Sequence, residues 1–167
     1  MDSTCSMNIL CTFKTSDWIT ILGLLVNSGL AIWIVRTIQN NLKNRRVLKD
    51  HFITELKDIR KEYKICLTNL YANSTYPKNI IPWFKLMNIK VTDLMECITL
   101  KYKIDKATLS PYQNELRDLV TDNEDFIRQY ESNSPVIFSE GSKNTFILFQ
   151  QKYNGLFNQL IIKINDV

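Results

Sequence analysis

The sequence predicts an all-α protein, in which a single N-terminal transmembrane helix continues into a small cytoplasmic helical bundle. Glycine and proline are scarce, with 4 of each in 167 residues, and alternating strand patterns are rare. Residues 18–35 carry no formal charge, and apolar residues recur at helical spacing in most of the remaining chain. The predicted organisation is an extracytoplasmic segment (1–17), a transmembrane helix (18–35), a basic juxtamembrane helix (36–72) and the rest of the bundle (73–167).

The segment WITILGLLVNSGLAIWIV, residues 18–35, is long enough to cross a hydrocarbon core at about 1.5 Å per residue. Trp18 and Trp33 lie near its ends, where indole rings favour the membrane interface. A cleaved signal peptide would need a basic leader and a small-residue cleavage site, but residues 1–17 hold a single lysine. A buried soluble helix would explain neither the tryptophans nor the charges that follow. The segment is therefore interpreted as a membrane span.

Positive charge gathers directly after this span. The group that we call the basic collar consists of Arg36, Lys43, Arg45, Arg46 and Lys49. Residues 1–35 have a net charge of -1, and residues 50–167 balance 15 basic against 15 acidic side chains. The five cations of the collar therefore account for the positive net charge of +4. By the positive-inside rule, we expect the N-terminus outside and residues 36–167 in the cytoplasm.

One face of the predicted span is small or polar. Its residues recur at steps of 4, 3, 4 and 4, and they are Ser16, Thr20, Gly23, Asn27 and Ala31. An amide that faced lipid alone would be costly, so this stripe should face protein or water. Two interpretations remain open: helix association through small residues and an asparagine hydrogen bond, or the lining of a water-filled pore. Both require a homo-oligomer.

A heptad-like pattern continues the helix beyond the span. Steps of 4 and 3 alternate along a mainly apolar stripe with two charged members: Ile38, Leu42, Arg45, Lys49, Phe52, Leu56, Ile59, Tyr63, Cys66 and Leu70. No glycine or proline interrupts residues 36–70, so one unbroken helix is expected. The charges at Arg45 and Lys49 suit a hydrated surface or phosphate headgroups better than a dry interface.

Three further helices complete the predicted bundle. A turn at residues 73–82 precedes a helix with the apolar stripe Trp83, Met87, Val91, Leu94, Ile98 and Tyr102. Ser110 is expected to cap a third helix that extends to about Tyr130. A loop at 131–142, with a short extended piece at 136–138, precedes a fourth helix that Ser142 caps and Gly155 weakens. The apolar stripe of this fourth helix is Phe146, Phe149, Tyr153, Leu156, Leu160 and Ile164.

Few residues suggest chemistry. The chain has no glycine-rich phosphate loop, no CxxC and no HExxH, so no cofactor and no metal site are predicted. Cys66 is expected to be a small core residue, while Cys5 and Cys11 could pair in an oxidising compartment. The only histidine, His51, follows Arg46 by five positions. An imidazole can transfer a proton at an RNA 2′-hydroxyl while a guanidinium steadies the phosphate. Five residues on a straight helix turn through about 140°, so the two side chains of one chain should not converge.

The layout resembles a known family: the small accessory membrane proteins of type VI-B CRISPR systems. The similarity consists of one N-terminal span, a basic juxtamembrane stretch with Arg-x4-His at Arg46 and His51, and a helical body in fewer than 200 residues. It implies a HEPN-like bundle, a ring-shaped homo-oligomer (an octamer) and a pore that depolarises the bacterial inner membrane. It also implies a CRISPR RNA-guided RNase as functional partner. Val47 departs from the polar residue that nucleases of this superfamily place after the arginine, which favours a structural or gating role.

Three functional hypotheses follow. The first is an oligomeric membrane pore that supports antiviral defence, with Thr20 and Asn27 toward the lumen and the basic collar at its mouth. The second is a membrane-tethered, metal-independent ribonuclease that uses Arg46 and His51 across subunits, with RNA as substrate. The third is a membrane-anchored scaffold that recruits a partner.

Overall fold

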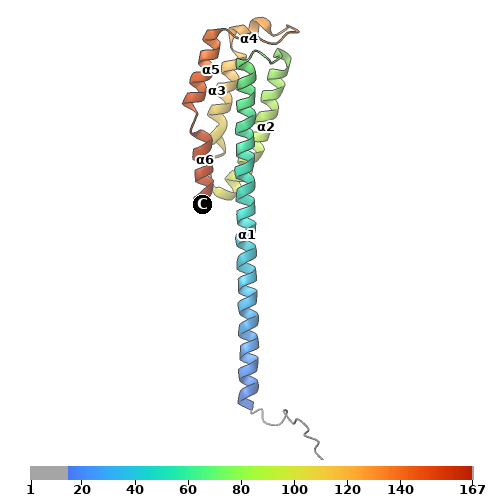
Figure 1. Ribbon diagram of the computed structural model, residues 1–167, viewed down its shortest axis with the longest axis vertical. Coiled ribbons are helices and arrows are strands. Elements are labelled where there is room, and N and C mark those ends of the chain that lie inside the picture. The colour runs from blue at the N-terminus through green and yellow to red at the C-terminus, as the bar shows by residue number, and fades with distance from the viewer. Residues whose placement is uncertain (1–14, 167) are drawn as a thin grey trace, which may run out of the picture. The chain divides into compact units, whose positions relative to one another are not determined.

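The computed structural model of the chain describes the backbone of residues 15–166 and the side chains of residues 18–166. Its elements are α1 (Thr15–Tyr71), α2 (Pro77–Tyr102), the 3-10 helix η1 (Lys106–Leu109), α3 (Ser110–Thr121), α4 (Glu124–Gln129), α5 (Glu140–Lys152) and α6 (Leu156–Asn165) (Figure 1). No strand occurs within residues 15–166, so the all-α prediction is confirmed. Most of the predicted extracytoplasmic segment, with Cys5 and Cys11, lies outside the described residues.

The chain divides into two compact units, one up to Val47 and one from Leu48 to Val167. Helix α1 runs from Thr15 to Tyr71 and contributes to both. The prediction that the apolar helix continues unbroken into the following residues is confirmed. The absence of glycine and proline from residues 36–70 accounts for this, because either residue would weaken or interrupt the helical hydrogen bonds.

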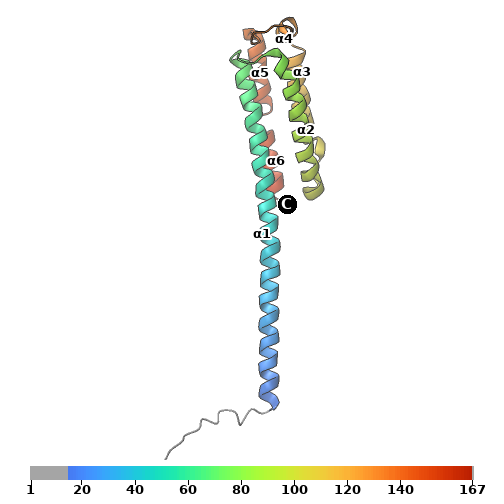
Figure 2. The same cartoon turned by 90° about the vertical axis from the view of Figure 1, so that its right-hand side faces the viewer.

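The second unit is a helical bundle. The part of α1 from Leu48 onward, α2, α3 and the pair α5 and α6 lie around one core, with α5 and α6 following one another along the same side (Figures 1 and 2). Helix α1 contributes buried side chains at helical spacing: Phe52, Leu56, Ile59, Tyr63, Leu67 and Leu70. The heptad prediction is thus confirmed from Phe52 onward, apart from Cys66, which is half-buried, and Leu67, which it missed.

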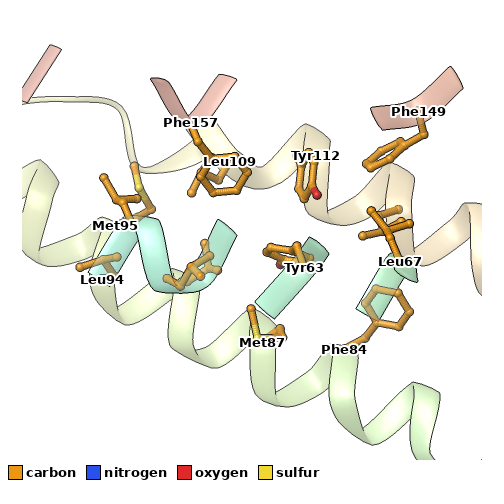
Figure 3. Close-up of a cluster of buried hydrophobic side chains, with 14 of the residues drawn as sticks. Tyr63, Leu67, Phe84, Met87, Leu94, Met95, Leu109, Tyr112, Phe149 and Phe157 are labelled. Atoms are coloured by element: carbon orange, nitrogen blue, oxygen red, sulfur yellow. The ribbon is translucent and has the colours of Figure 1, made fainter. Parts of the chain in front are cut away.

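Aromatic rings fill the centre of this bundle (Figure 3). Tyr63 of α1 meets Tyr112 of α3 edge to face with ring centroids 4.9 Å apart, and Phe157 of α6 lies 5.4 Å from Tyr112. Such pairs contribute about 0.5–1.5 kcal/mol each beyond the burial of their area. These contacts tie three helices that are far apart in sequence to a common centre.

The boundaries of α2 differ from the prediction. The turn is confined to residues 72–76, since α2 begins at Pro77 and includes Pro82. Pro77 costs little in the first turn because its missing N–H would have no helical partner there, whereas Pro82 lies inside the helix. The predicted stripe from Met87 to Tyr102 is buried, which confirms the face that α2 presents to the core.

The predicted third helix is interrupted. It consists of α3 and α4, separated at Asp122 and Asn123, and Asn123 caps α4 by accepting a hydrogen bond from the Asp125 N–H at 2.9 Å. Ser110 is not a cap, because η1 precedes it and Leu109 occupies the N-cap position of α3. The side chain of Gln113 donates to the Tyr63 hydroxyl instead of completing a capping box.

The last predicted helix is also divided. Ser139, not Ser142, is the N-cap of α5, and its Oγ accepts from the Ser142 N–H at 3.3 Å. Helix α5 ends at Lys152 and α6 begins at Leu156, so the interruption falls beside Gly155, where the sequence indicated a weak point. The predicted apolar stripe packs in or against the core on both sides of this interruption.

The loop before α5 is irregular, although the sequence indicated an extended piece there. Val136 and Phe138 are buried, with exposed fractions of 1% and 2%. The Val136 N–H donates to the Thr75 carbonyl at 2.9 Å, and the Phe138 N–H donates to Asn73 Oδ1 at 2.9 Å. The loop therefore satisfies its backbone through the turn after α1 rather than through a sheet.

Candidate functional site

The predicted span lies entirely on α1 and is exposed along its length. Its large apolar side chains range from 39% exposed at Ile21 to 69% at Ile19. An 18-residue window of this helix has a mean hydropathy of 2.0 and none of it is buried. Such a surface is costly in water at about 25 cal/mol per Å². By length and composition, α1 can cross a membrane.

The small and polar stripe is accessible on this helix. Thr20, Gly23, Asn27 and Ala31 belong to exposed positions of α1, and their spacing places them on one helical face. A Cβ added at Gly23 would meet no atom within 4 Å, so the backbone is open to close approach there. The side chain of Ser16 lies outside the described residues.

The basic collar divides into two parts. Arg36, Lys43, Arg45 and Arg46 are exposed residues of the first unit, whereas Lys49 belongs to the second and is half-buried. Lys49 Nζ donates to the carbonyl oxygen of Asn165, the last residue of α6, at 3.0 Å. A cation at this end of a helix satisfies a carbonyl without an intrahelical partner and complements the helix dipole. Lys49 thus has a structural role that the charge pattern did not indicate.

Arg46 and His51 lie five positions apart on helix α1. Both are exposed, they belong to different units, and α1 has no break between them. The imidazole of His51 lies against the ring of Phe52, with ring centroids 5.7 Å apart. The imidazole thus touches the ring of a core residue while it stays exposed.

The most strongly bound carboxylate in the bundle is one that sequence reasoning missed. Asp125 is 9% exposed; its Oδ2 accepts from the Ser139 N–H at 2.9 Å and the Ser142 hydroxyl at 2.8 Å. Its Oδ1 accepts from the Arg128 guanidinium at 2.7 Å. These hydrogen bonds hold the pKa of Asp125 well below its usual range, and the bond from the Ser139 backbone N–H has the largest effect. Because protein donors bind both oxygens, this carboxylate joins α4 to α5 and is poorly suited to act as a base.

A second carboxylate joins α3 to the end of α5. Glu115 accepts from Lys152 Nζ at 2.6 and 2.8 Å, and from the Tyr153 hydroxyl at 2.7 Å. Both hydrogen bonds lower the pKa of Glu115, and the one from Lys152 has the larger effect. This cluster also performs a connecting role.

The two described cysteines differ in environment. Cys66 is half-buried, and burial raises the pKa of its thiol to about 12, so the thiol stays protonated and unreactive at neutral pH. This agrees with the structural role expected for Cys66. Cys97 is exposed on α2. Among residues 18–166, no group of three or more histidine, cysteine or acidic side chains is arranged to hold a metal ion.

The feature that distinguishes this chain is therefore the exposed apolar helix with its polar stripe, attached by the same helix to a bundle with an aromatic core. Comparison with protein-family models, with curated proteins and with solved structures finds no match.

Proposed function

We propose that this protein is a single-pass membrane protein whose spanning helices associate into a homo-oligomer that permeabilises the bilayer. The observation that carries the proposal is the wholly exposed apolar part of α1 with a polar stripe on one face. A lipid bilayer covers the apolar side chains, while the stripe requires another copy of the helix or water.

Asn27 and Gly23 provide the interactions that would hold the spanning helices together. An amide in the hydrocarbon region is stabilised when it bonds across helices, by about 0.6–2 kcal/mol in model systems. The open backbone at Gly23 lets a second helix approach closely. In a ring of several chains the same face would surround water, and Thr20 and Asn27 would line the lumen.

The collar supports the proposed orientation. Arg36, Lys43, Arg45 and Arg46 follow the span, and by the positive-inside rule they favour a bundle in the cytoplasm of a bacterial cell, beneath the inner membrane. Exposed cations at this level attract acidic headgroups, at about 1 kcal/mol per residue.

The biological setting that we propose is antiviral defence, and it comes from the resemblance to the accessory proteins of type VI-B CRISPR systems. In that setting an octameric ring would depolarise the infected cell, and the companion RNA-guided RNase would be the functional partner. The ring contact of His51 with Phe52, and the apolar Val47 after Arg46, support a non-enzymatic role for the Arg46 and His51 pair.

The experiment combines particle mass with membrane leakage. We expect the detergent-solubilised particle, corrected for bound detergent, to contain at least a hexamer, and the reconstituted protein to release a small dye from vesicles. Asn27→Leu should lower leakage at least several-fold. Ser28→Leu, on a different face of the same exposed helix, is the matched control and should leak like the wild type.

A monomeric or dimeric particle would contradict the pore. Equal leakage of Asn27→Leu and wild type would contradict the role of the stripe. Normal biological activity after replacement of the whole span by an unrelated one would favour the anchored scaffold.

A further inference from the structure

The bundle contains a pocket that none of the proposed membrane functions uses. It has a volume of about 360 Å³ and lies between α2 and α3, with Tyr63 of α1 as its third side. This volume falls within the roughly 300–1,000 Å³ of small-molecule sites. All of its residues belong to the second unit, so its geometry is independent of the membrane span.

The charged side chains that line this pocket are both cationic. They are Lys85 of α2 and Arg117 of α3, and no carboxylate is among the lining residues. Helices α2 and α3 run in opposite directions (Figures 1 and 2). Ile81, about one turn before Lys85, and Thr121, about one turn after Arg117, also line the pocket. Because the two helices are antiparallel, these offsets correspond, and we infer that the two cations lie at about the same level. This arrangement favours an anion that both can contact.

Both cations are available for a ligand. Arg117 bonds to the neighbouring Asp118 at 2.7 and 2.9 Å, but the two side chains are 51% and 50% exposed. An exposed pair of this kind contributes little, so the guanidinium can turn to a phosphate. Lys85 has no ion pair within residues 18–166.

The rest of the lining combines aromatic surface with amides. Phe84 and Tyr63 are 7% and 2% exposed and belong to the buried cluster of the core (Figure 3). Both also line the pocket. Gln113 Nε2 donates to the Tyr63 hydroxyl oxygen at 3.2 Å, which leaves the hydroxyl proton for an acceptor inside the pocket. Asn88 and Asn114 add amide groups that can donate and accept.

We propose that this pocket binds a nucleoside monophosphate, with the phosphate between Lys85 and Arg117 and the base beside Phe84 and the two asparagines. Asn88 and Asn114 each lie three residues from the cation on their own helix, a rise of roughly 4.5 Å, which a ribose can span. A fatty acid would also satisfy the cations and the aromatic surface, but it has no polar groups at its other end that could bond to the exposed amides of Asn88 and Asn114.

The test is calorimetric titration of the full chain in detergent with AMP, GMP, CMP and UMP. We expect saturable binding of at least one nucleotide, weakened about tenfold or more by Lys85→Gln and by Arg117→Gln. Lys101→Gln is the matched control, because Lys101 is an exposed lysine of α2 outside the pocket, and it should bind like the wild type. Inorganic phosphate and adenosine, which each supply half of the ligand, should bind at least tenfold more weakly than the best nucleotide.

A local probe distinguishes this pocket from other surfaces. The Trp83 ring lies 5.5 Å from that of Tyr63 and 5.1 Å from that of Phe84, so occupancy should change its fluorescence in a Trp18→Phe, Trp33→Phe background. Absence of binding at millimolar nucleotide, equal binding of decanoate, unchanged Trp83 emission, or pocket variants that match Lys101→Gln would each overturn the proposal. Because the pocket lies within the bundle, these results are independent of whether the span forms a pore.

Discussion

Asp125 allows the sharpest test of how the bundle is held together. Asp125→Ala removes the acceptor for the Ser139 N–H, for the Ser142 hydroxyl and for the exposed Arg128 guanidinium. Hydrogen bonds to a charged group contribute about 1.5–3 kcal/mol when buried. We reduce this to about 1 kcal/mol for each serine, because both are partly exposed, and assign almost nothing to Arg128, which is 70% exposed. The expected loss is about 2 kcal/mol.

Thermal unfolding followed by circular dichroism measures this loss. For a unit of this size, about 2 kcal/mol corresponds to a decrease in the melting midpoint of roughly 8 °C. Asp122→Ala is the matched control, since this exposed neighbour receives only one long hydrogen bond, from Thr121 at 3.3 Å. A midpoint of Asp125→Ala within 2 °C of the wild type, on the order of 0.5 kcal/mol, would refute the reasoning.

The effect of Asp125 should also depend on pH. Its folded pKa is lowered, so the unfolded chain binds the proton more tightly and the ionised carboxylate stabilises the folded state. This contribution is complete above the unfolded pKa of about 4 and is lost as the pH falls toward the folded value. The gap in melting midpoint between wild type and Asp125→Ala should therefore shrink below about pH 4. A gap that is constant with pH would assign the loss to packing.

Three further substitutions test the core, the collar and the rival enzyme. Leu116→Ala, at a side chain 0% exposed, should cost about 2–5 kcal/mol by chemical denaturation, whereas Leu86→Ala, 67% exposed, should cost less than about 0.5 kcal/mol. Lys49→Met should lower stability by about 0.5–1 kcal/mol through its lost bond to the end of α6, and Lys43→Met should not; equal melting curves would remove the structural role of Lys49. Purified wild type and His51→Ala should both leave RNA intact in a gel assay, and cleavage by the wild type alone would revive the ribonuclease hypothesis.

Sequence patterns predicted most of the helices because helix existence depends on local properties. The uncharged run from Trp18 to Val35 and the heptad stripe on α1 each repeat over many residues, so single errors average out. Helix ends depend on which tertiary partner satisfies a few backbone groups. Ser110 and Ser142 are both good caps in isolation, yet Leu109 and Ser139 occupy the cap positions.

The connecting carboxylates and the pocket were beyond the reach of sequence patterns. Asp125 and Ser139 are separated by 14 positions, and nothing in the spacing predicts that one accepts from the other. The same holds for the pairing of α2 with α3, which brings Lys85 and Arg117 to one pocket. For Arg46 and His51, the unbroken helix agrees with the expectation that the two side chains of one chain do not converge, and a site shared between chains stays a prediction.

The large sequence separation between α1 and the residues of α6 that it contacts has a consequence for biosynthesis. Its apolar bundle face is made early, but its partners on α6 follow about one hundred residues later: Arg60 bonds Asn158 across 98 positions, and Lys49 bonds Asn165 across 116. At roughly 5–20 residues per second, translation would leave that face uncovered for about 5–20 seconds. During this interval the nascent chain would expose two apolar surfaces, the candidate span of α1 and the face of α1 that later packs in the core. If the span inserts into a membrane during synthesis, as we propose, only the second surface would stay exposed until α6 is made.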